Sequence, residues 1–490
     1  MVERGLERIG IDSNRWRRIN WVRIVLPLLA IAAAAWIGRN APTMGVLGRG
    51  GLEAMLAIVL MIIAAVLVLY RVEWGILAIV ATSFMIRFSL PTGSGTVIPA
   101  SMVVASFVVL VWLLSMLIRR NVKLAPGGYV APALLFIVIC IMSVPYSWLI
   151  LRPDLFGRGG SGQSGLSFSF VQLGGVALMI LLPAVMLMTA NVLREVKYFK
   201  ALFAMMLIVA IPELLQRLGI MSFSFGTTFV LRTGASYALW LVALTCGQAL
   251  FNQTLKIWQR AFLLSLAGIW LYIGAELGAT WFSGWMPAFA AVMFLVFFRS
   301  RILFSVVLAA ALFLFALRPE FYIDKIWVDA IHYDSNRFEI WQVIIFDLTL
   351  TKTNIFLGAG PAGYLPFYET YYPRNAWVSH NNYVDIFAET GIIGFSIFMW
   401  LLYAIFRGGW DQREKMPSGF LRGFNYGVLA GFVGTLLAMG LGDWFIPFVY
   451  NIGIPGFDFA VYGWLLVGAM LALRHFARSD ESASLDSATT

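Results

Sequence analysis

Residues 374–394 read RNAWVSHNNYVDIFAETGIIG and join a polar, aromatic segment to an apolar run that continues to Phe406. His380 stands near the middle of this junction. Around it the chain is almost all apolar: of its 490 residues, 60 % are hydrophobic and only 12 % are charged. Soluble domains carry about 25 % charged residues, so this composition excludes an ordinary soluble domain. The junction is therefore where water, a titratable group and the start of a membrane helix meet.

Repeated apolar runs predict about fourteen membrane-spanning helices. They lie near residues 22–38, 52–70, 72–90, 99–118, 130–150, 170–190, 199–218, 235–251, 260–278, 284–298, 302–317, 383–406, 424–441 and 458–473. Lys and Arg gather in alternate connections, so the positive-inside rule explains the net charge of +10 better than nucleic-acid binding does. The same rule predicts that both termini are cytoplasmic. Cys140 and Cys246 both fall inside apolar runs, so we expect them to be packing residues. Two such cysteines do not predict a metal site or a disulfide framework.

The predicted fold class is an all-α polytopic membrane protein with one long extracytoplasmic loop. Helices 1–11 occupy residues 1–317, the loop occupies 318–382, helices 12–14 occupy 383–475, and a disordered tail covers 476–490. The loop is rich in Trp, Tyr and Phe, which favours an ordered, functional segment.

Within this loop, residues 334–350 predict an amphipathic helix. Its apolar side chains recur at spacings of three, four and three: Phe338, Trp341, Ile345 and Leu348. Asn336 and Glu339 have the spacing of a capping box. Arg337 then falls in the first turn, where free N–H groups would favour an anion, although a solvated arginine on a surface helix fits the same pattern.

The segment LGAGPAGY at 357–364 predicts a tight turn through Gly358, Gly360 and Gly363. It lacks the Lys-Ser/Thr of a phosphate-binding loop and no strand pattern precedes it, so nucleotide binding is not expected. The turn would fold the following chain back over the membrane.

Ionisable residues cluster toward one side of the predicted membrane. They are Arg87, Glu213, Arg217, Glu276, Glu389 and Asp443. Because buried charges are costly in a membrane, this one-sided set predicts a water-filled cavity that opens to the outer face. Arg232 and Arg374 lie in outer segments, and together with Arg337 they could grip a diphosphate by bidentate pairing. Taken singly, each arginine equally suits a surface charge.

His380 precedes a predicted membrane helix, with Asn382 and Asp385 spaced like a helix-capping pair. A helix N-terminus disfavours imidazolium, so a neutral ring that accepts a proton is one interpretation. A hydrogen-bonded loop histidine is the other.

The chain also resembles a family. His380 and Asn381, nine residues and then Gly391-Ile-Ile-Gly394 are similar to the H-[NSQ]-x9-G-x-x-G pattern of bacterial O-antigen ligases. With LGAGPAGY and the Arg337…Trp341 pair, residues 270–410 resemble the wider superfamily, which includes O-antigen and exopolysaccharide polymerases and protein O-oligosaccharyltransferases.

The resemblance implies a GT-C-like glycosyltransferase of the bacterial cytoplasmic (inner) membrane that works without metal or cofactor at the outer face, in cell-envelope polysaccharide or lipopolysaccharide synthesis. It implies a glycan donor on undecaprenyl diphosphate and an acceptor hydroxyl on a glycan or lipid-linked glycan. His380 would activate the acceptor, and Arg337 of the R-x-x-x-W element would engage the diphosphate with help from Arg232 or Arg374. The supporting cavity residues would be Asn381, Glu389, Glu276 and Trp341.

One departure from the family concerns a Ser-Arg-Gly motif. Here residues 279–289 read ATWFSGWMPAF, so Ser283 and Gly284 are adjacent with no arginine between them. Either another arginine makes the second diphosphate contact or the activity differs. A ligase, a polymerase of the same superfamily, a lipid or polysaccharide transporter, and a structural or sensory membrane protein all stay open at this point. Against a transporter, no repeat-related pair of broken helices is evident.

Overall fold

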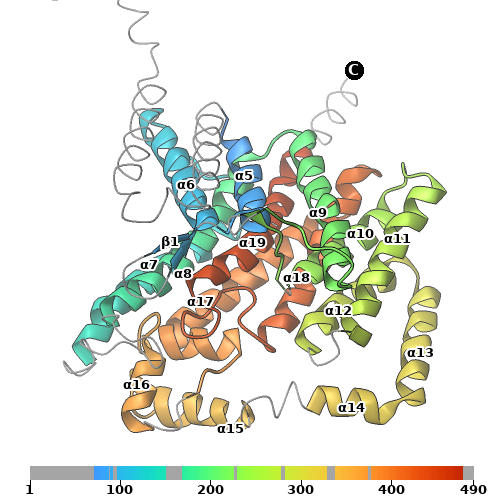
Figure 1. The fold of residues 1–490 in the computed structure, drawn as a ribbon. Helices are drawn as coiled ribbons and strands as arrows, with labels where there is room; N and C mark the ends of the chain where they lie inside the picture. The colour runs from blue at the N-terminus through green and yellow to red at the C-terminus, as the bar shows by residue number, and fades with distance from the viewer. Residues whose placement is uncertain are drawn as a thin grey trace, which may run out of the picture.

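The structure is a computed structural model that describes residues 71–87, 89–91, 97–150, 168–225, 229–234, 236–277, 282–327, 337–372 and 377–477. The predicted spans at 22–38 and 52–70, Arg374, Asn336 of the predicted capping box and nearly all of the predicted tail lie outside these residues. Within them the chain is a bundle of helices, as Figure 1 shows, and this confirms the helical class predicted from sequence.

The bounds of the helices follow the apolar runs closely. They are α5 (Val72–Met85), α6 (Ala100–Ile118), α7 (Val130–Ile150), α8 (Phe168–Val192), α9 (Val196–Arg217), α10 (Ser236–Phe251), α11 (Ile257–Tyr272) with η3 (Ile273–Leu277), α12 (Phe282–Arg299), α13 (Arg301–Leu317), α14 (Pro319–Trp327), α15 (Arg337–Gln342) with η5 (Val343–Thr349), α16 (Tyr364–Tyr371), α17 (Asn382–Gln412), α18 (Phe420–Met439), η6 (Ile454–Gly456) and α19 (Phe457–Ala472).

Each of the twelve predicted spans that fall in the described part of the chain coincides with one of these helices. In that part, nine helices are long and apolar enough to cross a membrane, and three apolar helices, α5, α10 and α13, are shorter. These features are compatible with a protein that crosses the membrane several times.

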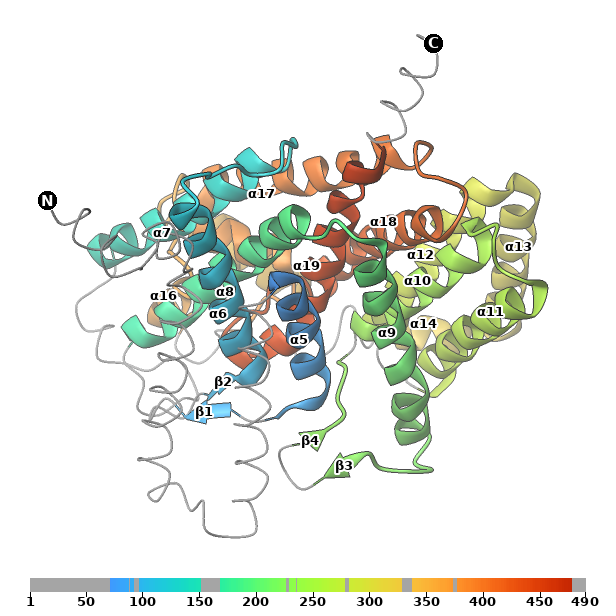
Figure 2. The same cartoon turned by 90° about the horizontal axis from the view of Figure 1, so that it is seen from above.

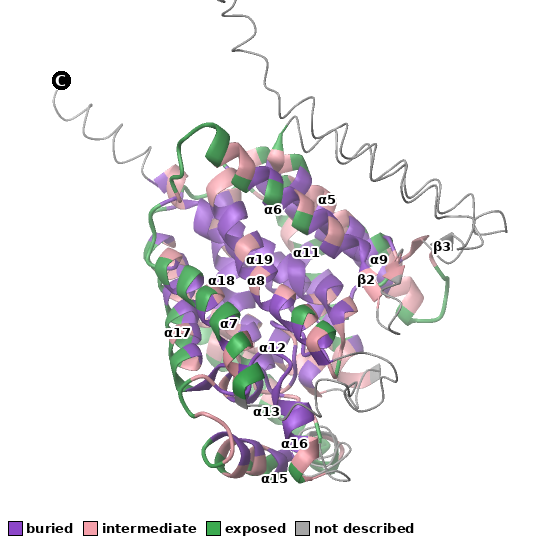
Figure 3. Cartoon of the chain, turned by 90° about the vertical axis from the view of Figure 1, so that its left-hand side faces the viewer, coloured by how far each residue is buried: buried purple, intermediate pink, exposed green. Residues whose placement is uncertain are grey.

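The centre of the bundle is made by α8, α10, α18 and α19, and Figure 3 shows α8, α18 and α19 as the most continuously buried helices. Small residues let them approach closely: a Cβ added at Gly247 of α10 would lie only 2.5 Å from the Cα of Gly427 of α18. Such contacts between small residues are typical of membrane helix packing. By contrast, α13 has no buried residue and exposes apolar side chains, as a helix that faces lipid would.

Two short antiparallel hairpins complete the described fold, β1 (Ser89–Pro91) with β2 (Val97–Pro99) and β3 (Ser224–Phe225) with β4 (Phe229–Val230). A bridge between Ile86 and Phe229 brings the ends of α5 and β4 together. Figure 2 shows both hairpins at the same side of the bundle.

The segment between α13 and α17 forms short helices along one end of the bundle, where α14, α15 and α16 lie in Figure 1. A helix forms in the predicted region, and its predicted apolar face is right for the buried Leu348 and wrong for Phe338. Phe338 is 53 % exposed, and the buried stripe is Ile340, Ile344 and Leu348. The α15 helix passes into the π-helix η5, whose i→i+5 bonding widens the turn, and the buried Ile344 and Leu348 lie four residues apart there.

Candidate functional site

The helix that follows His380 is broken at Gly391, whose backbone has φ 64° and ψ −170°. This conformation is open to glycine and strongly strained for other residues. It divides α17 into a short half, residues 382–390, and a long half, residues 392–412. An added Cβ at Gly391 would lie 2.3 Å from the carbonyl carbon of Phe356, so the break also lets a second chain segment approach.

That second segment is the glycine-rich turn predicted at 357–364. The N–H of Ala359 donates to the carbonyl of Ala388 at 2.9 Å, and the N–H of Gly360 donates to that of Glu389 at 2.8 Å. On the other side of the break, the N–H of Ile392 donates to the carbonyl of Ile355 at 2.7 Å. The turn therefore satisfies backbone groups that the broken helix leaves unpaired.

Glu389 joins the same arrangement through its side chain. Its Oε1 accepts a hydrogen bond from the backbone N–H of Ala362 at 2.6 Å, and the residue is only 2 % exposed. Glu389 was predicted to line a cavity, and in the structure it holds the glycine-rich turn against the short half of α17. A cavity of about 10 Å³, room for about one water molecule, lies against Asn382, Asp385 and Glu389.

The start of α17 is fixed by three consecutive polar residues. His380 has a positive φ of 49°, uncommon for a residue with a side chain. The helix cap is Asn381, whose side-chain oxygen accepts from the N–H of Tyr383 at 2.9 Å and of Val384 at 3.3 Å. The predicted capping pair of Asn382 and Asp385 is thus wrong by one residue. Asn382 instead binds the connection between α18 and α19.

Asp385 lies one turn into α17 and is buried. Its Oδ1 accepts from the hydroxyl of Tyr364 at 2.7 Å and from Oγ of Ser379 at 2.5 Å. Trp341 donates its indole N–H to the backbone carbonyl of Ser379 at 2.7 Å. The residue immediately before His380 is therefore held from two directions, by α15 and by α17.

A second buried carboxyl group, Asp443, comes from the connection between α18 and α19 and interacts with Asp385. Burial raises the pKa of Asp443, and hydrogen bonding with Asn451 and Asp385 and the charges of His380 and Arg337 only partly reverse this. Asp443 therefore keeps its proton to a higher pH than a free carboxylic acid. Arg337 is 6 % exposed, and its Nη1 donates to the carbonyl of Leu441 at 3.3 Å.

Asn451 connects the histidine with this carboxyl group. Its Nδ2 lies 2.9 Å from Nδ1 of His380 and 2.6 Å from Oδ2 of Asp443. Nδ2 is a donor, so in this orientation Nδ1 of His380 and Oδ2 of Asp443 both accept. Rotating the amide by 180° would instead turn its oxygen, an acceptor, toward both groups. The protonation of Asp443 is therefore coupled to which ring nitrogen of His380 carries the proton.

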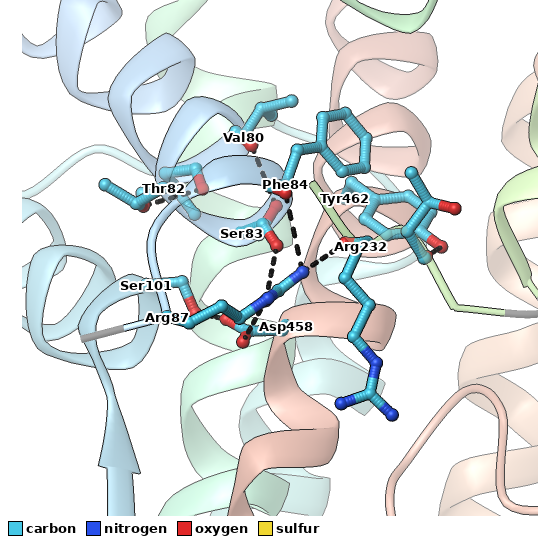
Figure 4. A network of polar contacts seen from close by, with 11 residues as sticks. Val80, Thr82, Ser83, Phe84, Arg87, Ser101, Arg232, Asp458 and Tyr462 are labelled. Atoms are coloured by element: carbon cyan, nitrogen blue, oxygen red, sulfur yellow. Dashed lines mark hydrogen bonds and ion pairs between the residues drawn. The ribbon is translucent and has the colours of Figure 1, made fainter. Parts of the chain in front are cut away.

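Arg232 belongs to a different group, around α5 and α19 (Figure 4). There Arg87 donates to Oδ2 of Asp458 at 2.7 Å and to the backbone carbonyl of Arg232, while Ser101 donates to the other oxygen of Asp458. The guanidinium of Arg232 turns away from this network in Figure 4 and lies over the ring of Phe459, 5.4 Å from its centroid. Arg232 is exposed.

Glu276, a predicted support residue, and Ser283, singled out in the departure from the family motif, lie in other surroundings. Glu276 sits in the π-helical end η3, where it accepts from the hydroxyl of Tyr322 at 3.3 Å and pairs with Arg318 at 3.8 Å. Ser283, at the place of the missing Ser-Arg-Gly arginine, is buried and lines a second cavity of about 10 Å³ beside Trp444 and Thr435. The wide, water-filled cavity stays a prediction.

Sequence reasoning placed His380, Asn381, Arg337 and Trp341 in one site, and the structure brings these four residues together. It missed the roles of Asn451, Ser379 and Tyr364. Asn451 belongs to no motif, and Ser379 and Tyr364 lie inside singled-out segments without having been recognised as site residues. None of the known protein families matches the chain, and no curated protein of known function matches it.

Proposed function

We propose that the protein transfers a glycan from undecaprenyl diphosphate to an acceptor hydroxyl, with His380 as the general base and Arg337 as a diphosphate ligand. The observation that carries the proposal is the linked group of His380, Asn451 and Asp443 at the head of a broken helix, with Arg337 close to the same carboxyl group. The similarity to the O-antigen ligase pattern supports the same assignment.

In the proposed reaction, the acceptor oxygen attacks the anomeric carbon and loses its proton to His380. The bond from that carbon to the diphosphate oxygen breaks, and the lipid diphosphate leaves with the electron pair. Arg337 would offset the charge that develops on this leaving group, as fixed cations do most effectively when desolvated. Arg232 and Arg374 remain candidates for the second diphosphate contact.

Asp443 gives the base a defined tautomer in this scheme. When Asp443 carries its proton, a rotation of the Asn451 amide by 180° would turn its oxygen toward both groups, and that oxygen could then accept from Asp443 and from the Nδ1–H of His380. The neutral ring then has its lone pair on Nε2, the nitrogen that would take the acceptor proton. The raised pKa of Asp443 favours this arrangement.

The proposed topology has about fourteen spans, with the segment 318–382 and His380 at the outer face of the bacterial cytoplasmic membrane. The alternation of Lys and Arg along the chain supports this orientation.

The test is transfer in reconstituted membranes with a lipid-linked glycan. We expect His380→Ala to reduce transfer by a factor of about 10² to 10⁴. The matched control is His475→Ala, which removes a histidine beyond the end of α19 and should leave transfer unchanged. Wild-type transfer by His380→Ala would refute the mechanism, whereas persistence in Arg337→Ala would refute only the diphosphate contact. A ladder of products would indicate a polymerase, and a single capped acceptor a ligase.

A transporter of lipid-linked glycans is the second candidate, because α17 is broken in the membrane-spanning part of the chain. Discontinuous helices form the binding sites of many transporters. In the same vesicles, movement of the donor across the membrane with no new glycosidic bond would favour this alternative over the transferase.

A further inference from the structure

A pocket of about 580 Å³ lies at the end of α17 farthest along the chain from His380. It forms where the start of α7, the long half of α17 and the end of α19 meet. Pockets of about 300–1,000 Å³ are the usual size for small-molecule ligands. Nothing in the proposed transfer reaction uses this pocket.

The lining of the pocket is cationic. Arg407, Lys415 and Arg474 face it, against a single carboxylate, Asp411. Asp411 is already engaged, because its Oδ2 accepts from Nε of Arg407 at 3.1 Å. The pocket therefore has a net positive charge and suits an anion.

The position of one cation in the pocket, Arg474, is already fixed by its neighbours. The guanidinium of Arg474 lies over the ring of Tyr129, 5.4 Å from its centroid. The backbone at Gly127 approaches so closely that an added Cβ would lie 2.6 Å from Nη1 of Arg474. A cation packed in this way loses little freedom when it binds a ligand.

Tyr129 also provides an independent sign of a ligand. Its side chain is 2 % exposed and lines the pocket, and among the residues that the structure describes its hydroxyl has no hydrogen-bond partner. A buried hydroxyl without a partner is costly, so a polar ligand group in the pocket would remove this penalty.

The apolar part of the lining distinguishes a lipid from a free ion. Trp400 and Tyr403 of α17 line the pocket and are 46 % and 63 % exposed. Trp and Tyr exposed near the end of a membrane helix are typical of the level of the lipid headgroups. Leu134 and Leu135, in the first turns of α7, are also exposed and offer apolar side chains to acyl chains.

We propose that this pocket binds the headgroup of an anionic phospholipid, with its phosphate between Lys415 and Arg474 and within reach of the Tyr129 hydroxyl. The positive-inside pattern places this end of α17 in the cytoplasmic leaflet, and basic pockets between helices on that side are typical lipid-headgroup sites. The lipid would link α7, α17 and α19 at their shared end.

The experiment measures lipid binding to the full chain in detergent by native mass spectrometry and by the rise in melting temperature. The probes are phosphatidylglycerol, phosphatidylcholine and inorganic phosphate. We expect phosphatidylglycerol alone to bind and stabilise, and we expect its affinity to fall about fivefold in Lys415→Gln and again in Arg474→Gln. Arg194→Gln removes an exposed arginine elsewhere and should bind as the wild type does.

Tyr129→Phe keeps the ring beside Arg474 and removes only the hydroxyl. We expect weaker phosphatidylglycerol binding with no loss of melting temperature in the absence of lipid, which separates a ligand contact from a folding defect. Equal binding of phosphatidylcholine would overturn the proposal. So would stabilisation by inorganic phosphate alone, which would make this a free-anion site, or unchanged phosphatidylglycerol affinity in both Lys415→Gln and Tyr129→Phe.

Discussion

Gly391→Ala tests whether α17 is broken, because the two possible forms of this helix predict effects of opposite sign. In a continuous helix, replacing glycine by alanine stabilises the fold by about 0.5–1 kcal/mol. At a φ of 64° and a ψ of −170°, the same substitution is strained. The sign of the change in stability therefore distinguishes the two forms.

The size of the loss follows from the contacts at the break. A side chain in this backbone conformation costs about 1–3 kcal/mol. The new Cβ would also lie 2.3 Å from the carbonyl carbon of Phe356 and 2.5 Å from the nitrogen of Leu357, backbone atoms that cannot rotate away. Moving that segment weakens the hydrogen bonds from Ile392 and Ile393, each worth about 1 kcal/mol. We expect a total loss of about 3–5 kcal/mol.

The measurement is thermal unfolding in detergent, followed by tryptophan fluorescence. Gly268→Ala is the matched control, because Gly268 lies within α11, is exposed, and has open space where a Cβ would be added. We expect Gly268→Ala to melt at or slightly above the wild-type temperature and Gly391→Ala to melt clearly below it. If Gly391→Ala melted at or above the wild type, α17 would be continuous and the packing of the glycine-rich turn against it would be wrong.

Two further substitutions test the surroundings of His380. Trp341→Phe removes the indole N–H that donates to Ser379, so we expect a loss of about 1 kcal/mol of stability and slower glycan transfer. The exposed Trp258→Phe serves as its control, and equal melting of the two variants would contradict the hydrogen bond. Because burial raises the pKa of Asp443, the stability that its protonated form contributes is present below its unfolded pKa and is lost as the pH rises through its folded pKa. We therefore expect Asp443→Asn to raise the melting temperature relative to the wild type at about pH 8 and to change it little at about pH 4; a difference independent of pH would show that Asp443 is not titrating.

The helices were predictable from sequence because long apolar runs have few alternatives in a membrane, where backbone groups must be paired within the chain. For this reason the predicted spans in the described part fall on helices from α5 to α19. Gly391 and Gly394 were recognised as a motif, but their spacing did not reveal that α17 breaks at the first glycine and not at the second. Only the approach of residues 354–363, brought in by tertiary packing, makes the break favourable.

The site residues were predictable only where a rare residue type or a local motif identifies them in the sequence. His380 stands out because the chain has three histidines, and Arg337 stands out beside Trp341. Asn451 is identified by neither, and it reaches His380 from 71 positions away because α18 and α19 return the chain to the same end of the bundle. The buried stripe of α15 and η5 was predicted only in part, and the π-helix η5 changes the period that sequence patterns assume.

The spacing between His380 and Gly391 now has a physical meaning. The intervening short half of α17 has nine residues, 382–390, which at about 1.5 Å per residue gives a rod of about 14 Å. Asp385 and Glu389 lie four residues apart on it and therefore share a face. From that face Asp385 accepts from Tyr364, and Glu389 accepts from the N–H of Ala362.

Of these two partners, Ala362 lies in the glycine-rich turn and Tyr364 is the first residue of α16. The glycine-rich turn thus contacts the short half of α17 at both Asp385 and Glu389. The break at Gly391 lets the short half run in a different direction from the long half. A longer or shorter rod would rotate one carboxylate off this face, since each residue turns the helix by about 100°. It would also move His380 away from Asn451, which belongs to the connection between α18 and α19. The interval between histidine and glycine is therefore set by two packed surfaces at once, one at each end of the rod.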